Sequence, residues 1–499
     1  MAITGGDLLN SVPSSQKQTL STNYLDFTGT TDNTFAQQYL PDLMEKEAEV
    51  FGPRTISGFL ASVGAEEPMS SDQVVWSEQS RLHISVKGTV ATAGSTNGTF
   101  TVTSDIDGNN ASSTPAFTLA NHGVRCNDIV LIASAGIVTK CKVVDADTAV
   151  IQVEPYDKAD LTGHATTAGG STLLVVGSEY GKGTKYYSNA DGSTESDSRG
   201  ANEPTFKSFS NKPIIMKDYY EVSGSDTARI GWVEVTAEDG TAGYLWYLKA
   251  EAETRLRFAD YMEMAMLEAE KTHADSVIGN FHGATDLGAG GAGTEGLFKA
   301  ISTRGNVTSG VTGVNAATDL AEFDAILAEF DSQGAIEENM MFVNRATSLA
   351  MDDMLASMNS YGAGGTSYGV FNNSEDMALN LGFSGFRRGS YDFYKSDFRY
   401  LNDKATRGGI NDASSANAIR GVMIPAGTSS VYDQTVGASM KRPFLHVRYR
   451  ASQTDDRRMK TWVTGSVGAA TSALDAMQIH MLTERCLITQ GANNFMLMK

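Results

Sequence analysis

The sequence has little cysteine and no spacing that would hold a metal ion. Only three cysteines occur in 499 residues, Cys126, Cys141 and Cys486, and no two of them form a CxxC pair. An odd number at these spacings argues against a disulfide framework and a zinc site, so we expect reduced thiols in the core. The seven histidines are scattered without the spacing of metal ligands. We therefore predict no metal and no cofactor.

Several motifs that mark enzyme sites are also missing. The chain contains neither an H-E-x-x-H sequence nor a Walker A sequence. Gly181–Thr184 lacks the order of a phosphate-binding loop, and Asp105–Asn109 lacks the spacing and the distal glutamate of a calcium loop. These absences favour a structural protein over an enzyme, and we predict no catalytic residues.

Basic residues and long apolar runs are scarce. Lysine and arginine total 39 against 59 aspartates and glutamates, which gives a formal net charge of −20. A dedicated DNA- or RNA-binding surface is normally basic, so this balance argues against one, although an acidic protein can surround nucleic acid without gripping it. No apolar run reaches the length of a membrane span, and the first lysine is Lys17, so we expect neither a membrane segment nor a secretory signal. We predict a soluble protein made in a reducing cytoplasm.

Residues 85–177 have the pattern of a separate β domain. Short runs rich in valine, isoleucine, threonine and phenylalanine alternate there with turn clusters such as Asp107-Gly108. The expected strands are Ile84–Val90, Thr99–Ser104, Ala116–Leu119, Ile129–Ala133, Val138–Val144, Ala149–Val153 and Thr172–Val176. This spacing predicts a β-sandwich or a small barrel of about 90 residues.

The longest helical pattern covers Thr241–Ile278. Apolar residues recur there at steps of three and four, which places them on one face of a helix roughly 50 Å long. Glu251 and Arg255 have the spacing of a surface ion pair. The predicted core positions of this helix are Leu245, Leu248, Leu256 and Met266.

The segments before this helix are polar or extended. Residues 1–33 are rich in serine, threonine and asparagine and cannot form a core alone. A short amphipathic helix is expected over Pro41–Phe51. Residues 178–210 resemble a long hairpin with three tyrosines, Tyr180, Tyr186 and Tyr187, on its first limb and a turn around Asp191.

A glycine-rich hinge at 283–293 leads into a mixed α/β region. Helices are predicted over Thr318–Phe330 and, capped by Asn344, over Ala346–Met358. The predicted strands are Met340–Val343, Asp392–Lys395, Gly421–Ile424, Phe444–Tyr449 and Met459–Val463, of which the last two are expected to form a hairpin.

This order of parts resembles the major capsid proteins of tailed bacteriophages, which have the Hong Kong 97-like fold. The stretch Phe209–Ser225, followed by Ile230-Gly-Trp and the long helix, carries most of the resemblance. Asn344-Arg-Ala-Thr and the glycine loop Tyr361–Tyr368 agree with it. The resemblance implies an α+β fold with an N-terminal arm, an extended E-loop, a peripheral P-domain built on a spine helix, and an axial A-domain.

Applied to this sequence, the resemblance divides the chain as follows. The arm is 1–54, the E-loop region is 55–84 with 178–208, the all-β insertion domain is 85–177, the P-domain is 209–285 with 475–499 and spine helix 241–278, and the A-domain is 286–474. The expected assembly-interface residues are Leu40, Leu43, Phe51, Tyr186, Tyr187 and Asp191.

The resemblance implies a structural protein that forms hexamers and pentamers of itself. These would build an icosahedral shell around double-stranded DNA without sequence-specific binding, with portal, scaffold and decoration proteins as further partners. The protein would be made in the cytoplasm of a bacterial host and would lie in the virion. Two alternatives are an encapsulin-like cargo shell and a multidomain enzyme or binding protein in which residues 85–177 form a carbohydrate-binding module.

Overall fold

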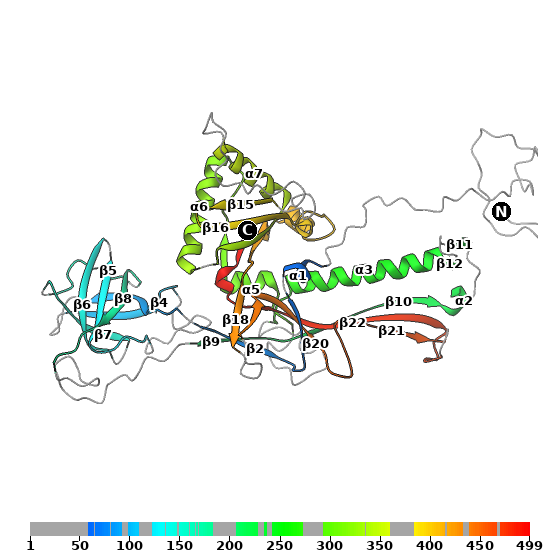
Figure 1. Ribbon diagram of the computed structural model, residues 1–499, viewed down its shortest axis with the longest axis horizontal. Coiled ribbons are helices and arrows are strands. Elements are labelled where there is room, and N and C mark those ends of the chain that lie inside the picture. Colours follow the sequence, from blue (N-terminus) through cyan, green and yellow to red (C-terminus); the bar gives the residue numbers. More distant parts are fainter. Residues whose placement is uncertain are drawn as a thin grey trace, which may run out of the picture. The chain divides into compact units, whose positions relative to one another are not determined.

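The computed structural model describes most of the chain after residue 57 (Figure 1). The described residues are 58–63, 65–79, 81–91, 98–108, 122–134, 136–146, 149–158, 160–164, 166–167, 169–182, 206–227, 234–236, 242–272, 293–334, 336–359, 384–414, 417–432, 439–466 and 470–499. They fall into two compact units. The described residues of the smaller unit lie within Tyr220–Arg257 and Thr464–Gln478, and those of the larger unit lie within Ile56–Tyr219, Phe258–Val463 and Ile479–Lys499.

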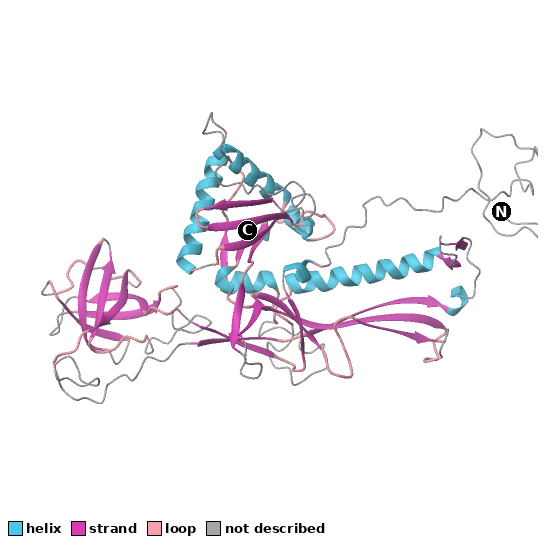
Figure 2. Ribbon diagram, in the orientation of Figure 1, coloured by secondary structure: helices cyan, strands magenta, loops and turns pink. Residues whose placement is uncertain are grey.

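A closed six-stranded antiparallel barrel lies in the larger unit (Figure 2). Its strands, in the order in which they pair around the barrel, are β3 (Ser85–Ala91), β4 (Thr99–Asp105), β7 (Val150–Pro155), β6 (Ile137–Asp145), β5 (Asp128–Ser134) and β8 (Ser171–Ser178). Alternate residues point inward, and Phe100, Ile132 and Leu173 are completely buried. The six predicted strands in the described residues are confirmed, and the structure is a barrel. The predicted strand Ala116–Leu119 lies outside the described residues.

A six-stranded sheet forms the second layered core of the larger unit. Its strands, in order, are β13 (Asn306–Thr308), β23 (Met496–Met498), β17 (Gly421–Pro425), β14 (Glu338–Val343), β16 (Tyr391–Asp397) and β15 (Ser384–Arg388). Helices α6 (Ala316–Gln333) and α7 (Arg345–Asn359) cover one face (Figure 2). Both predicted helices are confirmed. The side chain of Asn344 accepts a hydrogen bond from the Thr347 amide at 2.8 Å, as expected of a cap.

The other large sheet has the order β1 (Ala65–Met69), β20 (Leu445–Arg450), β22 (Ala476–Thr489) and β10 (Ile214–Ser223), and β21 (Lys460–Gly465) also pairs with β22. The predicted hairpin between β20 and β21 is therefore wrong. The turn between them closes through an Ala451–Asp456 bridge, but the 14-residue strand β22 is long enough to pair with both. The predicted domain 286–474 contains β20 and β21, but both strands pair with β22, which lies in the predicted segment 475–499. Strand β23 of that same segment pairs in the six-stranded sheet.

The remaining strands of the described residues form three two-stranded ribbons. They are β2 (Val74–Gln79) with β9 (Phe206–Asn211), β11 (Glu234–Thr236) with β12 (Ala242–Tyr244), and β18 (Thr428–Tyr432) with β19 (Ser439–Pro443). The shorter helical elements are α1 (Phe59–Val63), α2 (Gly224–Thr227), α5 (Leu297–Arg304), η3 (Arg399–Leu401), α9 (Arg407–Ala413) and η5 (Ala492–Asn494).

The long helix α3 spans Leu245–Glu268, which is shorter than the predicted 241–278. At 1.5 Å per residue its 24 residues extend about 36 Å. The helix stops where the amide of Gly296 donates to the carbonyl of Ala269 at 2.8 Å, a contact too close for a side chain at Gly296. None of the helices in the described ranges is long and apolar enough to span a membrane.

The buried face of α3 is rotated from the predicted one. Met266 is completely buried, as expected, but Leu256 is 46% exposed, so its assignment to the core is wrong. Phe258 and Met262 are the buried apolar residues on the turns before Met266, and Leu256 lies about 200° around the helix from Phe258. The side chains of Leu245 and Leu248 lie outside the described part. The expected Glu251–Arg255 ion pair is confirmed at 2.9 Å.

Candidate assembly interface

The predicted interface residues of the arm and the hairpin lie outside the described residues. Leu40, Leu43 and Phe51 fall within 1–57, and Tyr186, Tyr187 and Asp191 fall within 183–205. Their roles stay predictions. The structure instead describes buried polar contacts around the first described residues of the chain and around the β2–β9 ribbon.

Arg304, at the end of α5, holds the base of the β2–β9 ribbon. Its side chain is 9% exposed, and its guanidinium donates to the Glu295 carboxylate at 2.7 Å. The guanidinium carbon also lies 4.6 Å from the centre of the Phe209 ring and 5.7 Å from that of Trp76. These two rings belong to opposite strands of the ribbon and face each other in the register. Arg304 therefore clamps both strands through one buried cation.

Glu78 connects the same ribbon to the C-terminal turn. Its carboxylate accepts hydrogen bonds from the Trp76 indole at 2.9 Å and from the Gly491 amide at 3.0 Å. It also lies 3.7 Å from Arg304. Gly491 has a φ of 60°, a conformation that favours glycine. The indole and carboxylate lie on the same side of β2, two residues apart, so one strand face provides both contacts.

Asn211, at the end of β9, is the polar centre of this junction. It is 1% exposed, and its amide nitrogen donates to the carbonyls of Glu295 at 3.1 Å and Leu487 at 2.6 Å. Its amide oxygen accepts from the Thr294 hydroxyl at 3.1 Å and from the Glu295 amide at 2.9 Å. One side chain thus joins β9, the segment before α5 and β22. A buried amide with all of these bonds specifies a single arrangement of the three segments.

Glu263 of α3 holds the first described residues of the chain. Its carboxylate accepts hydrogen bonds from the amides of Gly58 at 3.3 Å and Leu60 at 3.1 Å. Burial raises the pKa of Glu263, whereas these two amides and the nearby cation of Arg485 act in the opposite direction. The contact fixes α1, whose Phe59 ring packs against Phe342 at 4.7 Å between ring centres.

A second buried cation lies in the sheet next to this contact. Arg485 on β22 is 5% exposed at its side chain and lies 3.5 Å from Glu66 of β1. Glu66 also pairs with Arg458. Arg485 donates to the Thr483 hydroxyl and to the Arg458 carbonyl, each at 2.9 Å. Burial lowers the pKa of Arg485, and the adjacent carboxylates oppose that effect, so the network keeps a buried charge paired.

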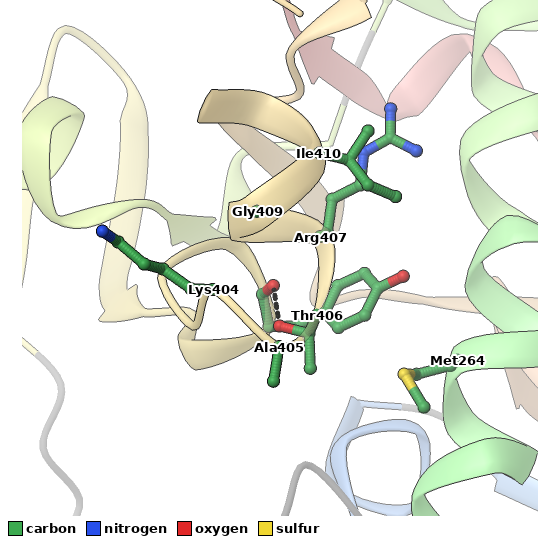
Figure 3. Close-up of a pocket in the computed structure, with 8 residues that line it drawn as sticks. Met264, Lys404, Ala405, Thr406, Arg407, Gly409 and Ile410 are labelled. Atoms are coloured by element: carbon green, nitrogen blue, oxygen red, sulfur yellow. Dashed lines mark hydrogen bonds between the residues drawn. The ribbon is translucent and has the colours of Figure 1, made fainter. Parts of the chain in front are cut away.

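A groove of about 460 Å³ opens between α3 and the segment before α9 (Figure 3). Met264 of α3 lies across it from Thr406, and Lys404 extends away from Met264. The Thr406 hydroxyl donates to the Tyr400 carbonyl at 2.7 Å. No described residue lining the groove is a carboxylate or a histidine.

The described residues contain no cluster of histidine, cysteine, aspartate and glutamate that could hold a metal. None of the three cysteines, all of which lie in the described residues, forms a disulfide; Cys141 and Cys486 are buried, and burial raises the pKa of each to about 12. Such thiols remain protonated and unreactive near neutral pH.

Two glycine-containing motifs add no described site. Gly365–Gly369 has the G-x-S-x-G form and lies outside the described residues, after helix α7 rather than after a described strand. Gly288–Gly293 has G-x-G-x-x-G spacing, but the described element before it is α3, again a helix. Both motifs take their chemical meaning from a preceding strand.

Sequence reasoning did not find Arg304, Asn211 or Glu263. Trp76 is buried, at 8% exposure, and its indole donates to the carboxylate of Glu78 on the same strand. The signal available was the i, i+2 pairing of a tryptophan with a glutamate on one strand face. The partners of Asn211 are 84 and 276 residues away, so no local pattern indicates its role.

No family model matches the sequence, and no curated protein matches it. Solved structures similar to this chain include phage structures and a virus-like particle from Pyrococcus furiosus. One of Microbacterium phage Oxtober96 covers 92% of this chain and 96% of its own, with 9% identity and a TM-score of 0.35. One of Mycobacterium phage Adephagia covers 94% and 98%, with 9% identity and a TM-score of 0.35. The capsid structure of the cyanophage P-SCSP1u covers 65% and 80%, with 7% identity and a TM-score of 0.32.

Proposed function

We propose that this protein is the major capsid protein of a tailed bacteriophage, a structural, non-enzymatic subunit that self-assembles into an icosahedral shell. The observation that carries the proposal is the β2–β9 ribbon. Its two strands pair only with each other among the described strands, and Val75 on its outer face is 63% exposed. A two-stranded ribbon is marginal by itself in water. Its base is nevertheless fixed by Arg304, Glu78 and Asn211.

A ribbon that is fixed at its base and exposed on its outer face is typical of an element that a neighbouring subunit covers. We assign residues 55–84 and 178–208 to such an E-loop, with the barrel of residues 85–177 inserted between its two limbs. The spine helix and the sheet of β10 and β22 form the proposed P-domain, and the six-stranded sheet with α6 and α7 forms the proposed A-domain. The proposed arm is 1–54. A closed shell needs many moderate contacts of this kind, related by symmetry.

The proposed contents of the shell are double-stranded DNA held by confinement. The net charge of −20 opposes strong binding of a polyanion to the subunit. Hexamers and pentamers of the chain itself are the proposed building blocks, with portal, scaffold and decoration proteins as proposed partners. The virion is the proposed location, after synthesis in the cytoplasm of a bacterial host.

Electron microscopy of the purified protein, together with analytical ultracentrifugation, tests this function. We expect closed shells, tubes, or rings of five or six subunits. A protein that remains monomeric both alone and when co-expressed with the other head proteins of its source would refute the proposal. Nucleic-acid content distinguishes a genome shell from an encapsulin-like cargo shell, which would contain protein instead.

The proposed arm is tested by deleting residues 1–33. If this segment interlocks neighbouring subunits, we expect the truncated protein to form fewer shells, or shells that dissociate at a lower denaturant concentration. Truncated protein that assembles as completely as the full chain, into shells of equal stability, would show that the segment is not an interlock. Circular dichroism of the two proteins controls for folding.

A further inference from the structure

Methionines are concentrated in one core of the described residues. The core between the six-stranded sheet and helices α6 and α7 has fourteen buried residues (Figure 1), of which six are methionine. They are Met341, Met351, Met354, Met423, Met496 and Met498. The barrel core also has fourteen described members, none of them methionine and most of them valine or isoleucine. Methionine has three rotatable bonds and fills a core in several ways, whereas valine and isoleucine are stiff at χ1, so the two cores differ in how strongly they specify one packing.

Three of these methionines form a row across the sheet, which we call the methionine row. Met341 of β14 lies directly opposite Met423 of β17, and Met423 lies directly opposite Met496 of β23. Residues directly opposite each other on neighbouring strands lie on the same face of a sheet. All three are completely buried in the core that α6 and α7 cover. The sheet therefore presents a band of unbranched, flexible side chains to the helices.

Helix α6 is held on this sheet by directional contacts. Its Phe323 meets the Phe393 ring of β16 edge-on, with 5.2 Å between ring centres and 70° between planes. Its Asp324 carboxylate accepts a hydrogen bond from the Arg388 guanidinium of β15 at 2.6 Å. Aromatic pairs and charged hydrogen bonds weaken when their geometry changes, so these contacts specify one position of α6.

Helix α7 is held differently along its length. Its first turn is fixed by the Asn344 cap and by Asn402, whose side chain accepts a hydrogen bond from the Arg345 amide at 2.7 Å. After this turn, the fully buried side chains in the described part of the helix are Met351 and Met354. These two residues are three apart and so lie on one face of the helix. Directional bonds therefore fix the start of α7, and methionine packs its later turns.

One long side chain joins the middle of α7 to the methionine row. Lys395 of β16 lies directly opposite Met341 and is 5% exposed. Its ammonium donates to the Ser348 carbonyl at 3.1 Å and pairs with the Asp352 carboxylate. A lysine side chain is a compact charge on a flexible four-carbon stem, so this link can follow a shift of the helix.

We propose that α7 has two positions on the six-stranded sheet. The helix pivots about its capped N-terminus, and its later turns slide over the methionine row while α6 stays in place. Small sliding of packed helices is one of the established modes of conformational change, and an unbranched core adapts to it with little loss of packing. The inference rests on the proposed shell function. Rings of five and rings of six set identical chains at different angles to their neighbours, so a subunit that joins both needs a part that shifts at small cost.

Methyl NMR of the unassembled full-length chain, labelled with ¹³C at the methionine Cε atoms, tests this movement. Met351 and Met354 are expected to show relaxation dispersion on the microsecond-to-millisecond timescale, with a second state populated to about 1–10%. The matched controls are Met266 of α3 and Met481 of β22, which are also completely buried and are expected to give flat profiles. Flat profiles at Met351 and Met354, or dispersion of equal size at the controls, would overturn the inference.

A paired substitution measures the part that the methionines play. Met351→Leu combined with Met354→Leu nearly conserves the volume of the core and replaces flexible side chains with ones that have well-defined rotamers. With Met423 as the NMR probe, the population of the second state is expected to fall about tenfold, whereas Met266→Leu leaves it unchanged. Circular dichroism verifies that both variants fold. A population in the paired variant within about twofold of the wild type would show that the methionines do not permit the movement and would overturn the inference.

Electron cryomicroscopy of assembled particles separates this inference from the proposed function. Shells in which α7 differs in position between rings of five and rings of six, with α6 unchanged on the sheet, support both. Shells in which α7 has one position in every ring overturn the inference and leave the shell function standing. Dispersion at Met351 and Met354 in a protein that never assembles supports the movement of α7 and counts against the shell function. The absence of both assembly and dispersion overturns both.

Discussion

Replacing Arg304, which contacts both strands of the β2–β9 ribbon at its base, tests directly what holds this exposed ribbon in place. The substitution Arg304→Met keeps most of the apolar stem of the side chain and removes the guanidinium. It therefore removes the 2.7 Å bond to Glu295 and the cation above the Phe209 and Trp76 rings. Ribbon strands that depend on this cation should open more often, while the rest of the fold remains.

The size of the effect follows from the burial of the group. A hydrogen bond to a charged partner contributes about 1.5–3 kcal/mol, and a cation over an aromatic face about 0.5–2 kcal/mol. Removing one partner of a buried ion pair costs about 3–5 kcal/mol, since the other charge is left unpaired. These values overlap rather than add, so we expect about 3 kcal/mol. Since 1.4 kcal/mol is a factor of ten, the ribbon should open about 150 times more often.

Amide hydrogen exchange measures this opening directly. In Arg304→Met we expect the amides of Val74–Gln79 and Phe206–Asn211 to exchange about 150-fold faster, with the barrel amides unchanged. The matched control is Arg345→Met. Arg345 is 65% exposed and pairs with Asp397, so its loss should change exchange by less than about threefold. Ribbon exchange in Arg304→Met within about fivefold of the wild type would refute the clamp.

Three further predictions concern buried groups. Burial raises the pKa of Glu263 above its ordinary 4.5, so the folded state binds the proton more tightly than the unfolded state does. The free energy of unfolding of the wild type, relative to that of Glu263→Gln, should therefore fall as pH rises through the folded pKa. Urea unfolding between about pH 4 and pH 8 measures this difference. Burial, with a smaller effect of Lys158, lowers the pKa of His164, whose ring nitrogens bond to the hydroxyls of Ser134 at 2.7 Å and Thr139 at 2.8 Å. The barrel should keep this stability above pH 6.5 and lose it as pH falls through the folded pKa, and His164→Gln should flatten that loss in acid-dependent melting. Phe100 is fully buried in the barrel, so Phe100→Ala should cost about 3–5 kcal/mol in denaturant unfolding, whereas Val138→Ala at a 62% exposed position should change it by less than about 0.5 kcal/mol.

The sequence predicted best the elements whose signals are local. The barrel strands were located because alternation with period two is visible within six or seven residues, as in Thr99–Asp105, whose burial alternates along its whole length. The helix before β14 was located by its apolar spacing, and its first residues follow the Asn315 cap, whose side chain accepts from the Thr318 amide at 2.9 Å. Neither feature depends on distant partners.

The predictions that failed depend on distant segments. Apolar spacing alone extended the long helix beyond Glu268, but the chain at Gly296 bonds to Ala269 and ends it there. The choice between pairing β20 with β21 or with β22 likewise depends on a strand that begins after both. The roles of Arg304 and Asn211 could not be predicted either, because their partners are distant in the sequence and are brought together only by the fold.

Buried polar contacts hold the first described residues and the base of the β2–β9 ribbon, and this has a thermodynamic meaning. Binding through an extended segment costs conformational entropy for each residue that becomes ordered. Glu263 fixes Gly58 and Leu60, and Arg304 fixes the base of the ribbon. Attachment points that are already ordered remove part of this entropy cost and set the direction in which the attached segment continues. The interaction with a neighbour can then be moderate at each site and still close a symmetric shell. For a subunit of this kind, mutations of Glu263 or Arg304 should impair assembly more than mutations of equally buried residues in the barrel.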